Sequence, residues 1–279
     1  MTDLSGKVAV VMGASGERSF GENIARLYAR HGAKVVVSAR RIEALDALAQ
    51  EIGGLAVRCD ISDDGQLEAL AKTVLERFGR IDIAVNSSGV LSWGPIAKLR
   101  PEDILPTMNV SVMGSLLFFK HMGNAIARSG GGSVITISSQ TAQIPAPGYA
   151  VYATARAGID FAMRVAACEY GPRKVRFNSI AAGLVRTDMT QDLFQIPGLE
   201  DAFIAATPLR RMGTPEDVSR VALWLADDAA SGFVTGEQIS VSGGGQHGRL
   251  VEHPTLNAMF QQALGDEDAA APSASAGPS

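Results

Sequence analysis

The sequence predicts an α/β fold built on a doubly wound parallel sheet, and two features of the 279-residue chain support this class. Short apolar runs rich in β-branched residues alternate with longer segments that have the pattern of amphipathic helices. These runs are nearly continuous rather than alternating, which is typical of strands buried on both faces. Right-handed crossovers between such strands place helices on both sides of one sheet.

The expected strands are the seven apolar runs at residues 7–12, 34–38, 55–58, 81–86, 133–137, 175–180 and 238–242. Helical patterns lie between them, for example at 42–52, 63–79 and 149–170, and the last ends at Gly171-Pro172, a natural helix stop. No linker or internal repeat interrupts residues 1–245, so we expect one domain there. Residues 246–265 form a C-terminal extension, and the Ala/Ser/Pro-rich residues 266–279 are expected to be disordered.

The composition excludes several classes of protein. A hydrophobic content of 46% allows a sizeable core, and a net charge of −4 without a basic block argues against nucleic acid as a partner. Two cysteines and four scattered histidines indicate neither a disulfide framework nor a metal site. No apolar run approaches the roughly 18 residues of a membrane span, and the N-terminal segment lacks a signal-peptide layout. We therefore expect a cytoplasmic protein with no membrane partner.

A glycine-rich turn follows the first expected strand. Gly13 ends the strand and Gly21 opens the next helix. Such a turn offers backbone N–H groups and the positive end of a helix dipole to a pyrophosphate. The turn does not match G-x-G-x-x-G, so an ordinary strand–helix connection stays open at this point.

The tip of the second expected strand carries two guanidinium groups and no acid. Dinucleotide folds that prefer NAD place an acid here for the ribose 2′-hydroxyl, whereas Arg40 and Arg41 suit a 2′-phosphate. The alternative is a solvated basic helix start. Asp60 follows the third strand, where a carboxylate can meet an adenine edge.

A tyrosine and an arginine lie four residues apart on the expected helix at 149–170. Tyr152 and Arg156 therefore share one helix face, with a permanent cation beside a phenol. One interpretation is a surface pair, and the other is a tyrosine whose proton is meant to move. Ser138 and Ser139 follow the run 133–137, at the carboxyl edge where parallel sheets bind ligands.

Taken with "NSSG" at 86–89, Asn109 and "RFNSIAAGLVRTDM", these motifs make residues 5–245 resemble the short-chain dehydrogenase/reductase (SDR) family. The Ser–Tyr spacing agrees, because Ser139 stands thirteen residues before Tyr152. The resemblance implies a single-domain, Rossmann-like doubly wound sheet of seven parallel strands. It also implies an oxidoreductase that transfers hydride between a nicotinamide and a carbonyl or secondary alcohol. Such a protein is expected to assemble as a homotetramer or homodimer.

The resemblance also implies roles for single residues. Tyr152 is the acid/base, Ser139 hydrogen-bonds the substrate oxygen, Asn109 helps to hold a water chain, and Thr187 touches the nicotinamide carboxamide. The expected cofactor is NADP (NADPH). The residues expected to bind it are Gly13, Ser15, Arg18, Ser19, Phe20, Gly21, Arg40, Arg41, Asp60, Ile61, Asn86, Gly89, Val185 and Thr187.

Arg156 departs from the family pattern, which usually has lysine four residues after the tyrosine. Arginine supplies a charge that favours tyrosinate at any pH, but it cannot release a proton. Three functions follow. The first is an NADP(H)-dependent reductase or dehydrogenase for an apolar small molecule. The second is a catalytically impaired SDR-like subunit or NADP(H)-binding scaffold that supports a partner. The third, an enoyl reductase, is suggested by the long first loop and disfavoured by the Ser139–Tyr152 pattern.

Two segments are expected on the substrate side. Residues 188–212 carry an apolar face and lie where the family keeps a mobile substrate lid. A short helix after Pro254 either caps a neighbouring subunit or covers the edge of the sheet.

Overall fold

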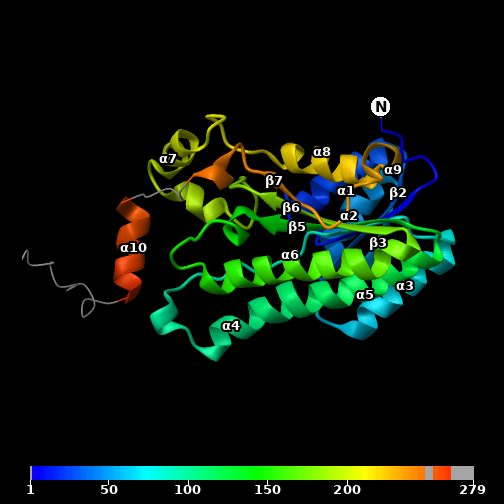
Figure 1. Cartoon of the computed structure of the whole chain (residues 1–279), viewed down its shortest axis with the longest axis horizontal. Helices are drawn as coiled ribbons and strands as arrows, with labels where there is room; N and C mark the ends of the chain where they lie inside the picture. The colour runs from blue at the N-terminus through cyan, green and yellow to red at the C-terminus, as the bar shows by residue number, and fades with distance from the viewer. Residues whose placement is uncertain (1, 249–253, 265–279) are drawn as a thin grey trace, which may run out of the picture.

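The computed structural model describes residues 2–248 and 254–264, and its centre is one seven-stranded parallel sheet (Figure 1). The strand order is β3-β2-β1-β4-β5-β6-β7. The predicted fold class is therefore confirmed. The strands are β1 (Val8–Met12), β2 (Lys34–Ala39), β3 (Leu55–Arg58), β4 (Ile83–Asn86), β5 (Gly132–Ser139), β6 (Val175–Ala182) and β7 (Gln238–Val241).

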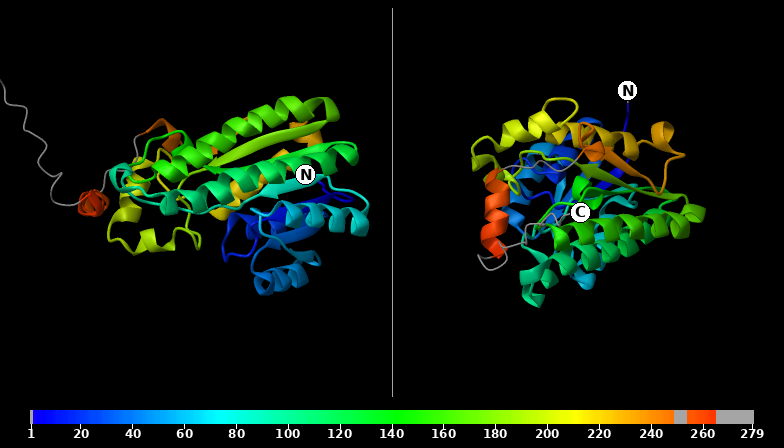
Figure 2. Two further views of the ribbon diagram at one scale, coloured as in Figure 1. Left: turned by 90° about the horizontal axis from the view of Figure 1, so that it is seen from below. Right: turned by 60° about the vertical axis from the view of Figure 1, so that its left-hand side comes forward.

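Helices cover both faces of the sheet (Figures 1 and 2). On one face lie α1 (Phe20–Arg30), α2 (Ile42–Ile52) and α8 (Pro215–Ala226). On the other lie α3 (Asp64–Phe78), α5 (Gly114–Arg128) and α6 (Ala150–Tyr170). The remaining α-helices of the described residues are α4 (Pro101–Thr107), α7 (Leu199–Ala206), α9 (Asp228–Ser231) and α10 (Pro254–Leu264).

The strand β1 shows why the apolar runs are continuous. Val8, Val10 and Met12 pack into the core on one side of the sheet, while Ala9 and Val11 pack into the core on the other. Successive side chains of a strand point to opposite faces, so a strand covered on both sides needs apolar residues at every position. The outer strands β3 and β7 lack this full burial.

Helix α6 follows the sequence prediction closely, since it runs from Ala150 to Tyr170 and ends at Gly171. The residues at positions 152, 156 and 160 are buried, and their spacing of four places them along one face. Strand β5 extends to Ser139, two residues beyond the predicted run, because its whole length pairs with β6.

The order of the strands creates a switch point between β1 and β4, where the chain winds outward in opposite directions. Ligands in such sheets bind in the crevice beyond the carboxyl ends of the strands. Helices α7 and α10 lie at the same end of the molecule in both views (Figures 1 and 2). No helix among the described residues is long and apolar enough to cross a membrane.

Candidate active site

A groove of about 320 Å³ lies beyond the carboxyl ends of β1 to β4. Most of the residues predicted to bind a cofactor line it: Gly13, Ser15, Ser19, Phe20, Arg40, Arg41, Asp60, Ile61, Gly89 and Thr187. Sequence reasoning missed several others, among them Ser87, Ser88 and Val110. Ser87 and Ser88 reach the groove through the turn after β4, and Val110 reaches it through the helical segment Met108–Met113.

The glycine-rich loop fits closely between β4 and α1. Gly13 has a φ of 86°, and a Cβ there would lie 2.8 Å from the Ser87 carbonyl carbon. A Cβ on Gly21 would lie 2.6 Å from the carbonyl oxygen of Gly13. Ser19 caps α1 by accepting a hydrogen bond from the Glu22 amide at 3.1 Å. The two glycines therefore allow the loop to pack tightly, and the loop ends at the amide end of α1, where anions bind.

The two arginines after β2 have different surroundings. Arg41 donates from Nη2 to the Ser15 carbonyl oxygen at 2.6 Å, which ties it to the glycine-rich loop. Arg40 is exposed at the rim of the groove. Burial works against the charge on Asp60, but hydrogen bonds from Ser62 and the charge of Arg40 hold the Asp60 pKa below its usual value. The groove thus carries a cation at the end where a 2′-phosphate is expected.

Four predicted cofactor residues do not line the groove. Asn86 donates to Ser115 Oγ at 2.9 Å and accepts from the Ser88 amide at 3.0 Å, so it shapes the turn after β4. Gly21 lies within α1, and Val185 lines a neighbouring cavity. Arg18 is exposed outside the groove, with a φ of 57°.

The neighbouring cavity, of about 150 Å³, contains the predicted catalytic pair and is called the catalytic cavity below. Ser139 and Tyr152 both line it. Ser139 Oγ accepts hydrogen bonds from the Thr141 hydroxyl at 2.9 Å and the Thr141 amide at 3.2 Å. Its own hydrogen therefore remains available for another acceptor. Tyr149 also lines the cavity, and burial raises the pKa of its phenol.

Arg156 is buried, with 4% of its surface exposed, so the interpretation as a surface pair is wrong. Its Nη1 donates to the Ile137 carbonyl oxygen at 3.0 Å, and both terminal nitrogens lie 3.4 Å from the Ser88 carbonyl oxygen. The guanidinium carbon lies 5.1 Å from the centre of the Tyr152 ring. This distance is within the range of cation–π contacts.

Asp160 is a buried acid one helical turn beyond Arg156, and sequence reasoning missed it. It accepts hydrogen bonds from Ser138 Oγ at 2.6 Å and from the Gln238 amide. Burial raises the pKa of Asp160, while the Ser138 hydrogen bond and the charge of Arg156 act in the opposite direction. Its spacing of eight residues from Tyr152 on α6 is the signal that indicates it.

Asn109 is not brought to the catalytic cavity. It lies in a π-helical segment, Met108–Met113, where it is exposed and lines neither the groove nor the cavity. The wider π-helical turn places Val110 in the groove and buries Ser111 instead. Asn109 therefore lies outside the lining of both spaces, and its role in holding a water chain stays a prediction.

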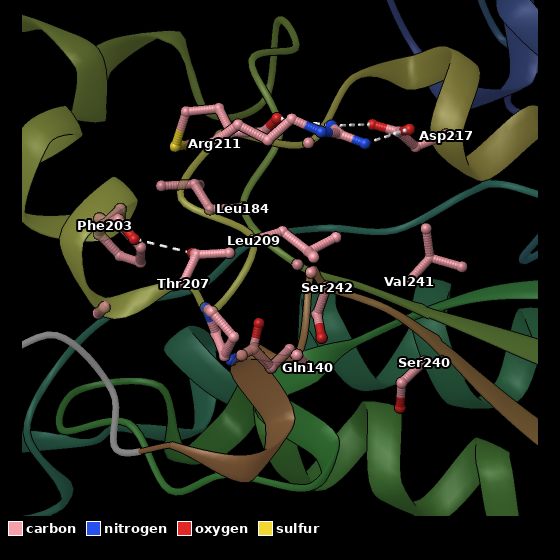
Figure 3. Close-up of a pocket in the computed structure, with 18 of the residues that line it drawn as sticks. Gln140, Leu184, Phe203, Thr207, Leu209, Arg211, Asp217, Ser240, Val241 and Ser242 are labelled. Carbon is pink, nitrogen blue, oxygen red and sulfur yellow. Dashed lines mark hydrogen bonds and ion pairs between the residues drawn. The ribbon is translucent and has the colours of Figure 1, made fainter.

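A further cavity of about 550 Å³ adjoins the catalytic cavity on the side of β7 (Figure 3). The two cavities share Gln140, Gly183, Leu184 and Phe203 as lining residues. Ser139 and Tyr152 line only the smaller one, so the larger cavity is not the place of the predicted chemistry. The described residues contain no group of three His, Cys, Asp or Glu side chains that could hold a metal ion.

The predicted substrate segment contributes Met189, Leu193, Leu199 and Phe203 to the catalytic cavity. Leu256 of α10 also lines this cavity, in the same chain. The helix after Pro254 therefore does more than cover the sheet edge.

Comparisons with known proteins agree with the fold and the motifs. A family model described as "Enoyl-(Acyl carrier protein) reductase" matches residues 13–246. An uncharacterized oxidoreductase of Methylorubrum extorquens is 38% identical, over 88% of this chain and 99% of its own. A short-chain type dehydrogenase/reductase from Mycobacterium ulcerans superposes with a TM-score of 0.89 at 29% identity, covering 95% of this chain and 98% of its own. A gluconate 5-dehydrogenase from Burkholderia cenocepacia, solved with NADP and tartrate, gives 0.84 at 25% identity, over 88% and 97%. The chain therefore belongs to the short-chain dehydrogenase/reductase family of oxidoreductases.

Proposed function

We propose that this protein is an NADP(H)-dependent oxidoreductase that interconverts the carbonyl and secondary alcohol of an apolar small molecule. One observation carries the proposal. The groove and the catalytic cavity share Phe20, Thr187 and Met189, so the two spaces adjoin. A cofactor bound in the groove would direct its nicotinamide end toward the cavity that Ser139 and Tyr152 line.

The groove fits the group that the family implies. The backbone of the glycine-rich loop would receive the pyrophosphate, and Arg40 and the loop-bound Arg41 would receive the 2′-phosphate. Asp60 and Ile61 would flank the adenine. Thr187 lies where the groove meets the catalytic cavity and Val185 lines that cavity, so these two residues would hold the nicotinamide end. The nicotinamide, when bound, supplies or accepts the hydride.

The chain itself supplies the proton chemistry. In the reductive direction, Tyr152 donates its phenolic proton to the carbonyl oxygen, and the Ser139 hydroxyl donates a hydrogen bond to the same oxygen. Arg156 stabilises the negative charge that remains on the tyrosine. Because a guanidinium does not release its proton, the proton that restores Tyr152 comes from another donor, such as water.

The test begins with cofactor binding, followed by fluorescence as NADPH or NADH is added. Consumption of the preferred cofactor is then measured with neutral ketones, and with an enoyl thioester as the comparison substrate. The proposal predicts tighter binding of NADPH and turnover of a ketone. Binding without turnover of any ketone supports the catalytically impaired subunit or scaffold instead, and reduction of the thioester alone supports an enoyl reductase.

We also propose that the chain forms a homodimer or homotetramer. Four apolar side chains on or next to α5 and α6 have exposed fractions between 43% and 65%. They are Met113, directly before α5, Leu116 of α5, and Phe161 and Val165 of α6. Exposed apolar side chains on adjacent helices mark interaction surfaces. Light scattering in solution is expected to give a multiple of the 29.2 kDa chain mass.

A further inference from the structure

The described residues place no carboxylate, amine, guanidinium or imidazole side chain in the wall of the catalytic cavity to match a charged substrate. Among the described residues, its lining contains no Asp, Glu, Lys, Arg or His side chain. Its polar groups are hydroxyls and an amide, from residues such as Ser139, Thr141 and Gln140. Moving a carboxylate or ammonium group into such a space is unfavourable, because the charge loses its hydration and gains no partner of opposite sign.

The cavity is also small. Its volume of about 150 Å³ is well below the roughly 300–1,000 Å³ of pockets that hold drug-sized ligands. Bulky apolar side chains set this volume, including Leu193 and Phe203 from the segment after β6. The part of a substrate that lies in this cavity is therefore compact as well as uncharged.

One of these side chains comes from the C-terminal helix. Leu256, Phe260 and Leu264 are half-buried and lie four residues apart along α10, whereas Asn257, Ala258, Met259, Gln261 and Gln262 are exposed. Residues four apart share one helix face. The apolar face of α10 is thus turned toward the body of the protein, and Leu256 at its start lines the catalytic cavity.

We infer that Leu256 is a specificity-determining residue, which limits the substrate to compact, neutral carbonyl compounds by closing the catalytic cavity from the C-terminal helix. This inference rests on the proposed function, since it concerns the substrate of the same site. It assigns a role to the C-terminal extension, which lies outside the segments that carry the family motifs.

The experiment compares wild type with Leu256→Ala and Leu256→Phe on a series of neutral methyl ketones whose second arm lengthens by one methylene at a time. A 2-oxo acid of matched size tests the effect of charge. Met259→Ala is the matched control, because Met259 lies on the same helix and is 44% exposed. Binding of the corresponding alcohols, measured by calorimetry with NADP present, gives a second readout that does not require turnover.

The ratio of kcat/KM for a long ketone to that for a short one is expected to rise about tenfold or more in Leu256→Ala. The ratio falls in Leu256→Phe and stays unchanged in Met259→Ala. The matched oxo acid is turned over at least about tenfold less efficiently than its neutral counterpart in wild type.

The inference is overturned if the Leu256 variants keep the wild-type ratio, or if the oxo acid is preferred. Failure of the proposed function is separate: it appears as absence of turnover in wild type. If the alcohols still bind with the expected dependence on size and on the Leu256 side chain, the inference about the cavity stands even without turnover. If they bind without that dependence, or do not bind, the inference fails as well.

Discussion

The guanidinium carbon of Arg156 lies 5.1 Å from the centre of the Tyr152 ring, and both side chains are buried. Two backbone carbonyl groups, of Ile137 and Ser88, hold the guanidinium. No acidic side chain of the described residues forms an ion pair with it within 4.0 Å. The positive charge is thus available to the phenol.

Gly89→Ala is expected to displace Arg156. A Cβ at Gly89 would overlap Arg156 Nη2, and the backbone at Gly89 itself does not require glycine. We expect turnover to fall about tenfold or more, because the displaced guanidinium no longer supports proton transfer by Tyr152. Steady-state rates check this, with Gly94→Ala as the control, because the nearest atom to a Cβ there is 4.0 Å away. A Gly89→Ala variant as active as the control contradicts the expectation.

Tyr152→Phe removes the proton donor and keeps the ring. We expect turnover to fall by about 10² to 10⁴ while cofactor binding persists. Tyr149→Phe is the matched control, because Tyr149 lines the same cavity, and it should retain most of the rate. Ser139→Ala is expected to lose less than Tyr152→Phe, because it removes one hydrogen bond to the substrate oxygen. A Tyr152→Phe enzyme near the wild-type rate means that another group is the acid/base.

Arg40 is expected to select the cofactor. It is exposed at the rim of the groove, while Arg41 is tied to Ser15. NADPH should bind at least about tenfold more tightly than NADH, a difference of about 1.4 kcal/mol. Arg40→Asp should reverse this order, whereas Arg58→Asp, at an exposed position that does not line the groove, should not. Equal affinities of wild type for the two cofactors, measured by fluorescence titration, are incompatible with this role.

Asp160 is expected to make stability depend on pH. Its pKa is raised in the folded protein, chiefly by burial, above the value of about 3.9 in an unfolded chain. The folded state therefore holds a proton that the unfolded state has already lost. The stability gained in this way is present below about pH 4 and is lost as the pH rises through the raised pKa.

Asp160→Asn cannot titrate, so its free energy of unfolding should gain on that of wild type as the pH rises from about 4 to neutrality. Urea unfolding at several pH values measures the difference. Asp46→Asn, on the exposed face of α2, is the control. A wild-type-to-variant difference that is the same at every pH shows that Asp160 does not titrate between the two states.

Much of this site was predictable from the sequence, because it depends on local spacing. The four-residue step from Tyr152 to Arg156 gives a shared face on any helix, and the ends of parallel strands meet at one edge of the sheet. The boundaries of α2 were predicted at 42–52, as observed, since the pattern is periodic and glycine follows it.

The remaining features depend on tertiary structure. The π-helical turn at Met108–Met113 determines that Asn109 is exposed, and no residue pattern announces it. Leu256 reaches the catalytic cavity through the path of the chain after β7. Arg40 and Arg41 are neighbouring residues of the same type, so the sequence does not distinguish their roles. Only the structure shows that Arg41 is bound to the Ser15 carbonyl oxygen. The predicted disorder of residues 266–279 lies outside the described residues.

The most direct test compares the turnover rates of wild type and Arg156→Lys with one neutral ketone and NADPH as the cofactor. Lysine keeps a cation but lacks the planar fork that contacts the Ile137 and Ser88 carbonyl oxygens. We expect an active wild type and a slower Arg156→Lys variant that keeps part of the rate. An inactive wild type that lysine restores to activity would contradict this expectation, and would identify the protein as an impaired subunit or scaffold.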